Sequence, residues 1–259
     1  MGSGGGGGFA TILIPARLAS ERLPRKPLLA ETGHPLIWHV VEAARRAACA
    51  REVVVATDSG EIVEAVEGRG GRTVMTSADH PNGTSRLAEA AAILGLGDEE
   101  VVVNVQGDEP EIEGEVIDAC ARALASTGAA MATVASPFSP DEDPNDPSIV
   151  KVVVRADGMA LYFSRSLIPH DRGTGDTGDE TVCVPLKHIG LYAYSAGFLR
   201  RYVGLEPTPL ERTERLEQLR VLEHGLSIGV ARCTVGSAGI DTEAQYAAFV
   251  ARSCASEST

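Results

Sequence analysis

The stretch TILIPARLASERLPRKPL, residues 11–28, joins a short apolar strand to a strongly basic loop. The β-branched run at its start is typical of a buried strand, and the prolines that follow end regular pairing. Ligands of α/β proteins bind outside the carboxyl ends of the strands, so we expect this loop to border a binding site. Its four cations and free backbone N–H groups suit a triphosphate, although a solvated loop has the same composition; the cations are Arg17, Arg22, Arg25 and Lys26.

Beyond this stretch, β-branched runs alternate with helical patterns. Strands are predicted at residues 11–14, 52–56, 73–75 and 101–105, and helices at 35–47, 61–67, 85–94 and 115–125. Such alternation is typical of right-handed βαβ units, and it predicts an α/β fold with a mostly parallel central sheet. The rest of the chain predicts a strand at 131–135, a hairpin of 149–154 with 160–163, a strand at 188–194, a helix at 211–223, a strand at 227–231 and a helix at 242–252.

The 259 residues are enough for one large α/β domain or two small ones, and we favour one domain with an excursion. We expect a flexible glycine-rich tail over residues 1–8, a single domain over 9–252 and a short tail over 253–259. Four prolines and four acidic residues lie between positions 136 and 147, where no regular element can form. We therefore expect an excursion from the central sheet over residues 136–187, which includes a Gly/Asp/Thr loop at 173–179.

The composition excludes several functional classes. A net charge of −13 would repel a polyanion along most of the surface, so no nucleic-acid partner is expected. No run of 18 apolar residues and no export signal is found, which predicts a cytoplasmic protein without a membrane span. The five cysteines are widely spaced and form no C-x-x-C pair, so we expect reduced thiols and no zinc site.

Two aspartates lie in positions that suit a magnesium ion. An apolar strand runs directly into Asp108, which places a carboxylate at the carboxyl end of the sheet, while Glu109 is expected to point the other way. Asp241 lies in a turn before the last predicted helix, where it equally suits an N-cap. Paired with Asp108, it becomes a candidate second ligand, because phosphoryl transfer commonly uses metal-bound carboxylates.

Taken together, the motifs resemble those of the bacterial 3-deoxy-manno-octulosonate cytidylyltransferases over residues 10–251. The match is specific because many short motifs occur in order with similar spacing. They include Ile14-Pro15-Ala16-Arg17, Arg22-Leu23-Pro24, Lys26-Pro27-Leu28, Ala56-Thr57-Asp58, Gly83-Thr84 with Arg86-Leu87-Ala88-Glu89, Val103 to Pro110, Tyr162-Phe163-Ser164-Arg165, His188-Ile189-Gly190-Leu191-Tyr192, Leu216-Glu217-Gln218-Leu219-Arg220 and Gly239 to Thr242.

The resemblance implies a Rossmann-like nucleotidyltransferase fold and transfer of CMP from CTP to 3-deoxy-D-manno-octulosonate (KDO), which activates the sugar for lipopolysaccharide synthesis. It implies Mg²⁺ as cofactor and a homodimer to which the excursion contributes. The implied nucleotide site is Pro15, Ala16, Arg17, Ser20, Lys26, Thr76, Gly83, Thr84, Arg86 and Gln106. The implied sugar site is Gln106, Arg165, His188, Tyr192, Glu217 and Gln218; Asp108 and Asp241 would hold magnesium, and Asp108, Lys26 and Arg17 would act in catalysis.

Two positions depart from the family pattern. Ser85 replaces a usual acidic residue, which bears on how the nucleotide pocket is braced, and Arg25 replaces a usual glycine and is expected to add charge beside the phosphates. Two alternatives to KDO transfer stay open: another acid sugar, such as an 8-amino analogue or a sialate, and a non-catalytic nucleotide-binding protein. We expect Arg165, His188 and Gln218 to converge on one pocket facing Asp108, although each also suits a structural role on the surface or in the core.

Overall fold

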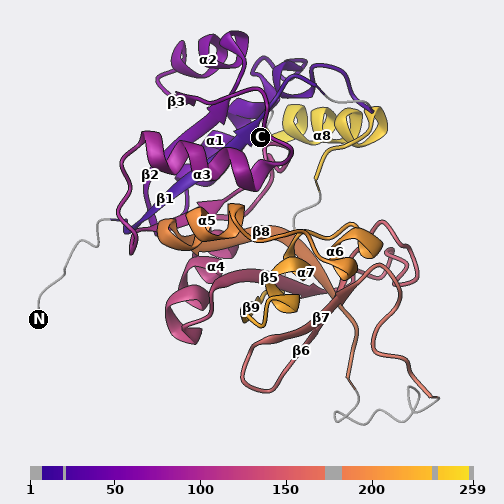
Figure 1. The fold of residues 1–259 in the computed structure, drawn as a ribbon. Helices are drawn as coiled ribbons and strands as arrows, with labels where there is room; N and C mark the ends of the chain where they lie inside the picture. The colour runs from indigo at the N-terminus through magenta and orange to yellow at the C-terminus, as the bar shows by residue number, and fades with distance from the viewer. Residues whose placement is uncertain (1–7, 20–21, 173–182, 235–238, 257–259) are drawn as a thin grey trace, which may run out of the picture. The chain divides into compact units, whose positions relative to one another are not determined.

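The structure, a computed structural model, describes residues 8–19, 22–172, 183–234 and 239–256 (Figure 1). The chain divides into two compact units, one of residues 1–118, 194–203 and 237–259 and the other of residues 119–193 and 204–236. Within the described ranges, no helix has the length and apolar character needed to cross a membrane. The expectation of one domain over residues 9–252 stays a prediction.

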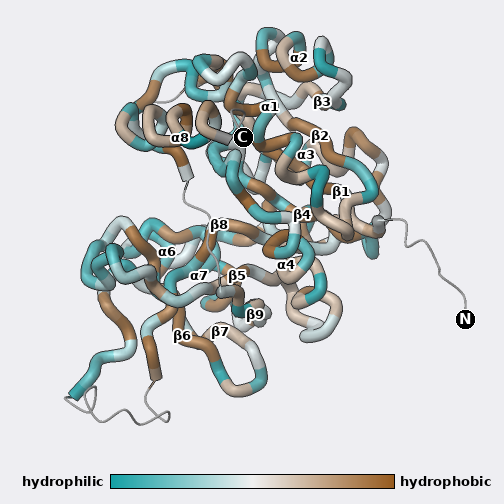
Figure 2. The backbone as a smooth tube through the Cα atoms, turned by 180° about the vertical axis from the view of Figure 1, so that it is seen from behind, coloured by the Kyte–Doolittle hydropathy of each residue, from teal (hydrophilic) through white to brown (hydrophobic). Residues whose placement is uncertain are grey.

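In its described part, the first unit is built on parallel strands in the order β3-β2-β1-β4. These are β1 (Ala10–Ala16), β2 (Ala50–Thr57), β3 (Arg72–Met75) and β4 (Val101–Asn104). Ile12, Leu13 and Ile14 are completely buried, as expected for a parallel strand covered on both faces. The apolar segments of the strands appear in brown in Figure 2.

Among the described residues, six helices belong wholly or partly to this unit. They are α1 (Leu36–Arg45), α2 (Gly60–Glu67), α3 (Gly83–Ile93), the start of α4 (Gly114–Thr127), α5 (Ala196–Val203) and α8 (Glu243–Ser256), with a short 3₁₀ turn at Lys26–Leu28. Asn82 caps α3 by accepting the Ser85 N–H at 2.9 Å, which fixes where the helix begins. The predicted parallel α/β architecture is confirmed here, whereas α5 was not predicted.

The second unit contains strands in the order β8-β5-β9, namely β8 (Leu186–Ser195), β5 (Met131–Pro137) and β9 (Ile228–Arg232). The predicted hairpin is confirmed: β6 (Lys151–Val154) pairs antiparallel with β7 (Ala160–Ser164), and β6 also pairs with β8. Gly158, with φ of 83°, lies in the hairpin turn, where a left-handed conformation favours glycine. From Phe138 to Val150 no helix or strand is formed, in agreement with the predicted connector.

The helix predicted at 211–223 is wrong as a single element. The structure has α6 (Pro209–Glu214) and α7 (Gln218–Glu223), separated at Arg215, whose φ of 53° is left-handed and cannot continue a helix. A buried ion pair joins the two pieces, because Arg220 donates from Nε to Glu211 Oε2 at 2.7 Å and from Nη2 to Oε1. The apolar periodicity of residues 211–223 is thus shared by two short helices and does not by itself show where one ends.

Candidate functional site

A cleft of about 790 Å³ lies in the first unit at the carboxyl ends of β1 and β4. The loop after β1, the entry to α3, the turn after β4 and the segment before α8 all contribute to it. Its lining is Pro15, Ala16, Arg17, Ala19, Arg22, Lys26, Pro27, His80, Asn82, Gly83, Arg86, Gln106, Gly107, Asp108 and Asp241. Most of the implied nucleotide residues therefore share one cleft; Ser20 lies outside the described residues.

The turn after β4 packs directly on the end of β1. A Cβ atom at Gly107 would lie 2.8 Å from the Pro15 carbonyl oxygen, which is closer than side chains allow. Glycine at this position lets the backbone approach β1 and brings the next residue, Asp108, to the cleft.

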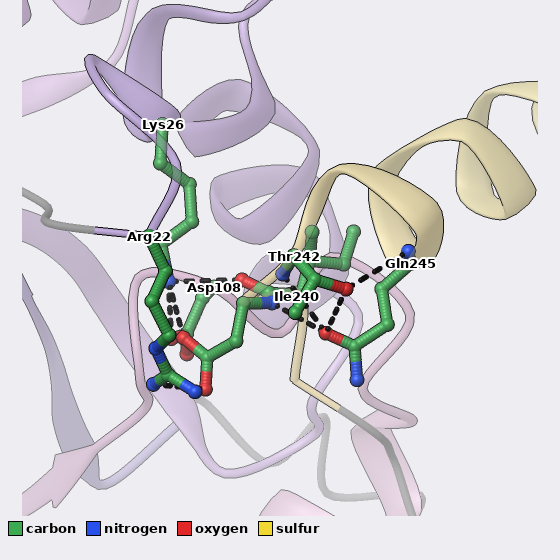
Figure 3. Close-up of polar contacts among 7 residues, drawn as sticks. Arg22, Lys26, Asp108, Ile240, Thr242 and Gln245 are labelled. Carbon is green, nitrogen blue, oxygen red and sulfur yellow. Dashed lines mark hydrogen bonds and ion pairs between the residues drawn. The ribbon is translucent and has the colours of Figure 1, made fainter.

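The centre of the cleft is an ammonium group between two carboxylates (Figure 3). Lys26 Nζ donates to Asp108 Oδ2 at 2.7 Å, to Asp241 Oδ1 at 3.0 Å and to the Ile240 carbonyl at 2.9 Å. The Lys26 side chain is only 13% exposed, so its charge is largely shielded from water. Arg22, one of the four loop cations expected to suit a triphosphate, donates instead to Asp241 Oδ2 at 2.9 Å.

The two aspartates have the chemistry of a magnesium site. Both are hard oxygen donors, and both lie within hydrogen-bonding distance of the same nitrogen atom. Over the described ranges, the structure has no group of three or more His, Cys, Asp or Glu residues that could hold a metal. Mg²⁺ commonly takes one or two carboxylates and fills its other positions with substrate and water oxygens, so a magnesium ion could be held by Asp108 and Asp241.

Glu109 differs from its neighbour Asp108, as expected. Its side chain is buried, and its Oε2 atom has no hydrogen-bond partner among the described residues. Burial, with a smaller contribution from the Asp108 charge, raises the pKa of Glu109 to about 8. At pH 7 Glu109 is thus mostly neutral, so Asp108 carries the negative charge of this dipeptide.

One wall of the cleft is braced by Arg86, the buried arginine in the first turns of α3. Arg86 donates to Thr76 Oγ1 at 2.7 Å and to Asp58 Oδ2 at 3.1 Å. Thr76 and Thr84 are buried and do not line the cleft. Thr76 therefore orients Arg86, a role that the motif alone did not reveal.

The departure at Ser85 takes part in a second brace. The His80 ring contacts Ser85 Oγ at 3.1 Å through Nδ1 and the Glu89 carboxylate through Nε2. Hydrogen bonds from His80 and, to a lesser extent, from the Ser77 N–H lower the pKa of Glu89. His80 and Asn82 line the cleft and were not among the predicted site residues; the Asn82-Gly83-Thr84 helix-entry signal is the feature that points to them.

The departure at Arg25 lies outside the cleft lining. Its φ of 56° is left-handed, a conformation that glycine adopts without strain. Its guanidinium pairs with Glu61 through both terminal nitrogens, and the charge–charge hydrogen bond raises the pKa of Arg25. The pairing with Glu61 outside the cleft lining does not support the expectation that Arg25 adds charge beside the phosphates, which stays a prediction.

Three of the implied sugar residues lie together in the second unit. The His188 ring is 5.0 Å from the Phe163 ring and 5.5 Å from the Tyr192 ring, and Tyr192 Oη donates to Gln218 Oε1 at 3.3 Å. Burial lowers the pKa of His188 to about 3, so this imidazole is neutral at pH 7. Gln218 is buried, and its Nε2 atom has no partner among the described residues, which leaves a donor for a ligand.

Of the other implied sugar residues, Glu217 and Arg165 lie near α6 and α7 of the same unit, whereas Gln106 lines the cleft of the first unit. Glu217 is the residue just before α7. Arg165 donates from Nε to the Glu214 carbonyl at 2.8 Å and from Nη1 to the Pro147 carbonyl at 3.0 Å. These acceptors are neutral, so they orient the guanidinium without cancelling its charge. The predicted convergence of Arg165, His188 and Gln218 with Asp108 joins residues of different units and stays a prediction.

Comparison with known proteins gives one consistent family. Residues 11–228 match the cytidylyltransferase family. A 3-deoxy-manno-octulosonate cytidylyltransferase of Idiomarina loihiensis is 52% identical over 238 residues, 90% of this chain and 94% of the relative. A protein of the same name from Yersinia enterocolitica is 49% identical over 234 residues, 89% of this chain and 93% of the relative. The solved structure of CMP:2-keto-3-deoxy-manno-octonic acid synthetase complexed with CTP matches with a TM-score of 0.87 at 38% identity, covering 95% of this chain and 99% of that one.

Proposed function

The chain belongs to the 3-deoxy-manno-octulosonate cytidylyltransferase family, and from this premise we propose how its residues transfer CMP from CTP to KDO. The observation that carries the proposal is the cleft at the carboxyl ends of β1 and β4, where Lys26 lies between Asp108 and Asp241. Cations for a triphosphate and carboxylates for a metal are present in the same cleft. A non-catalytic nucleotide-binding protein would not need this combination.

In the proposed reaction, the anomeric C2 hydroxyl oxygen of KDO attacks the α-phosphorus of CTP. The bond from the α-phosphorus to the bridging oxygen of pyrophosphate breaks, and the hydroxyl proton passes to solvent. Arg17 and Lys26 would bind the β- and γ-phosphates and neutralise the charge that develops on the leaving group. Such chemistry relies mainly on positioning and charge neutralisation, so it requires no dedicated protein base.

We propose magnesium as the cofactor, held by Asp108 and Asp241. When bound, it would supply Lewis-acid neutralisation of phosphate charge and lower the pKa of the attacking hydroxyl. The shared contact of both carboxylates with Lys26 supports this assignment, because it shows that the two carboxylates lie close enough together to reach one cation.

Pyrophosphate release from CTP tests the proposal as a whole. We expect release that requires KDO, is abolished by EDTA and is restored by excess Mg²⁺. Release with a sialate or an 8-amino analogue equal to that with KDO would overturn the choice of sugar. Full activity after exhaustive removal of divalent metal would overturn the magnesium assignment alone.

On the sugar side, we propose that Arg165 pairs with the KDO carboxylate, while His188, Tyr192 and Gln218 contact its hydroxyl groups. Supporting this, the Arg165 guanidinium is oriented by main-chain carbonyls and keeps its charge, and Gln218 has an unused buried donor. A site built from hydrogen bonds discriminates strongly against analogues that cannot make them.

We expect Arg165→Ala to raise the KM for KDO at least about 10-fold while the KM for CTP changes less than about threefold, because a charge-assisted hydrogen bond to the sugar is lost. Steady-state kinetics with each substrate varied in turn would check this. Arg155→Ala is the matched control, since Arg155 pairs with Asp157 in the hairpin turn. An effect of Arg165→Ala on CTP alone would show that the sugar assignment is wrong.

We also propose a cytoplasmic homodimer that supplies activated KDO for lipopolysaccharide synthesis. A cytoplasmic location follows from a nucleoside triphosphate substrate, and cell fractionation would test it. Exposed apolar side chains in the excursion support a dimer: Leu161 is 57% and Val184 67% exposed. Sedimentation equilibrium should give twice the chain mass of 27.1 kDa, and a mass of one chain at micromolar concentration would overturn the dimer.

A further inference from the structure

The segment that presents Asp241 is anchored by a side chain outside the cleft lining. Gln245, in the first turn of α8, is exposed, and its Oε1 atom accepts the Asp241 N–H at 2.8 Å and the Thr242 N–H at 3.0 Å. The Thr242 hydroxyl also donates to Oε1 at 3.2 Å and accepts the Gln245 N–H at 3.3 Å. Thr242 and Gln245 thus form a capping box at the start of α8.

Gln245 also affects the residue before the helix. The two N–H groups that its Oε1 atom accepts, those of Asp241 and Thr242, flank the Cα atom of Asp241. Holding the N–H groups of residues 241 and 242 on one oxygen fixes the two peptide planes on either side of that atom. Fixed planes set φ and ψ of Asp241, and these angles set the direction of its side chain. Figure 3 shows Gln245 reaching from α8 toward Thr242 and the segment that faces Lys26.

The peptide group between Ile240 and Asp241 is also held from the cleft side, through its carbonyl oxygen. The carbonyl of Ile240, which shares a peptide plane with the Asp241 N–H, accepts from Lys26 Nζ at 2.9 Å. The Ile240 N–H donates to the Asp108 carbonyl at 2.8 Å, and the Ile240 side chain is buried beside Leu23 and Tyr246. The backbone around Asp241 is therefore held by Gln245 on one side and by Lys26 and the Asp108 carbonyl on the other.

We propose that Gln245 is a positioning residue for the magnesium site, acting through the backbone of Asp241. The inference rests on the proposed role of Asp108 and Asp241 as metal ligands. Groups that orient metal ligands from outside typically change metal affinity or activity 10- to 100-fold when they are removed. Removing the Gln245 acceptor should accordingly weaken metal binding without removing any ligand.

The test uses Mn²⁺ alone as the probe, titrated into the nucleotide-free full chain and followed by electron paramagnetic resonance. Gln245→Met keeps the side-chain length and a high helix propensity but removes the oxygen acceptor. We expect its Kd for Mn²⁺ to rise at least about 10-fold, whereas Gln245→Glu, which preserves the box, should stay within about threefold of wild type or bind more tightly. The Mg²⁺ concentration for half-maximal turnover should rise in parallel, with kcat at saturating Mg²⁺ retained.

Val250→Ala is the matched control for a general loosening of α8. Val250 is partly buried against the apolar cluster of Leu23, Leu36, Ile240, Tyr246 and Phe249, and it lies in the same helix. Its Kd for Mn²⁺ should stay within about threefold of wild type even where its thermal midpoint falls as far as that of Gln245→Met. If Val250→Ala weakens binding equally, the effect is one of helix stability, and the positioning role is overturned.

Two further outcomes distinguish the role of Gln245 from the proposed magnesium site on Asp108 and Asp241. If Asp108→Asn loses Mn²⁺ binding while Gln245→Met stays within threefold of wild type, the metal site stands and the role of Gln245 falls. If the wild-type chain shows no Mn²⁺ binding that depends on Asp108, both fall together. Equal weakening by Gln245→Met and Gln245→Glu would also overturn the inference, because the box would then not be the cause.

Discussion

Asparagine in place of Asp108 should lower CTP turnover at least about 100-fold and leave the chain folded, because a neutral amide is a poor magnesium ligand and charge neutralisation contributes several kcal/mol to phosphoryl transfer. Folding should persist because Lys26 keeps its hydrogen bonds to Asp241 and to the Ile240 carbonyl. The measurement is steady-state pyrophosphate release at saturating Mg²⁺, together with circular dichroism to confirm the fold.

The neighbouring residue offers a control of the same chemical class. Burial keeps Glu109 mostly neutral at pH 7, so Glu109→Gln replaces one neutral group with another of similar shape. We expect Glu109→Gln to retain activity within about threefold at pH 7, because the charge that a metal uses belongs to Asp108. Wild-type activity in Asp108→Asn, or an equal loss in both variants, would contradict the metal assignment.

The second large effect is expected at Lys26. Lys26→Met removes the ammonium that both carboxylates share and the cation proposed for the β- and γ-phosphates. Loss of a preorganised donor to developing charge typically costs about 10²- to 10³-fold in kcat, and we expect a decrease in that range. Single-turnover kinetics at saturating CTP and Mg²⁺ would separate this chemical defect from weaker CTP binding.

Arg25, the adjacent residue, is the matched control for a general loss of positive charge in this loop. Its guanidinium is paired with Glu61 and does not line the cleft. Arg25→Met should therefore keep kcat within about threefold of wild type, although both variants lower the net charge of the loop by one. Similar losses from Lys26→Met and Arg25→Met would mean that the loop acts through its overall charge, which would contradict a specific role for Lys26.

Local sequence determined the architecture of the first unit and the position of its cleft. Strand and helix periodicities are properties of neighbouring residues. The alternation around 11–14, 52–56 and 101–105 therefore predicted strands β1, β2 and β4 and a mostly parallel sheet. The basic loop after β1 and the carboxylate after β4 could be placed for the same reason, because parallel strands end at one edge of a sheet. The reaction was predicted from the resemblance of the motifs to one family, since their order and spacing are specific to it.

Only the tertiary structure decided which of these charges act on one another. Asp108 and Asp241 are far apart in the chain, and their common contact with Lys26 arises because Ile240, just before α8, and Tyr246, within α8, pack in one apolar cluster with Leu23. Arg25 and Lys26 are neighbours with equal charge, yet Glu61 pairs with one and the two aspartates with the other. Helical periodicity continues across Arg215, but its backbone is left-handed and divides α6 from α7. In each case the outcome depends on burial and on partners distant in sequence, which no local pattern encodes.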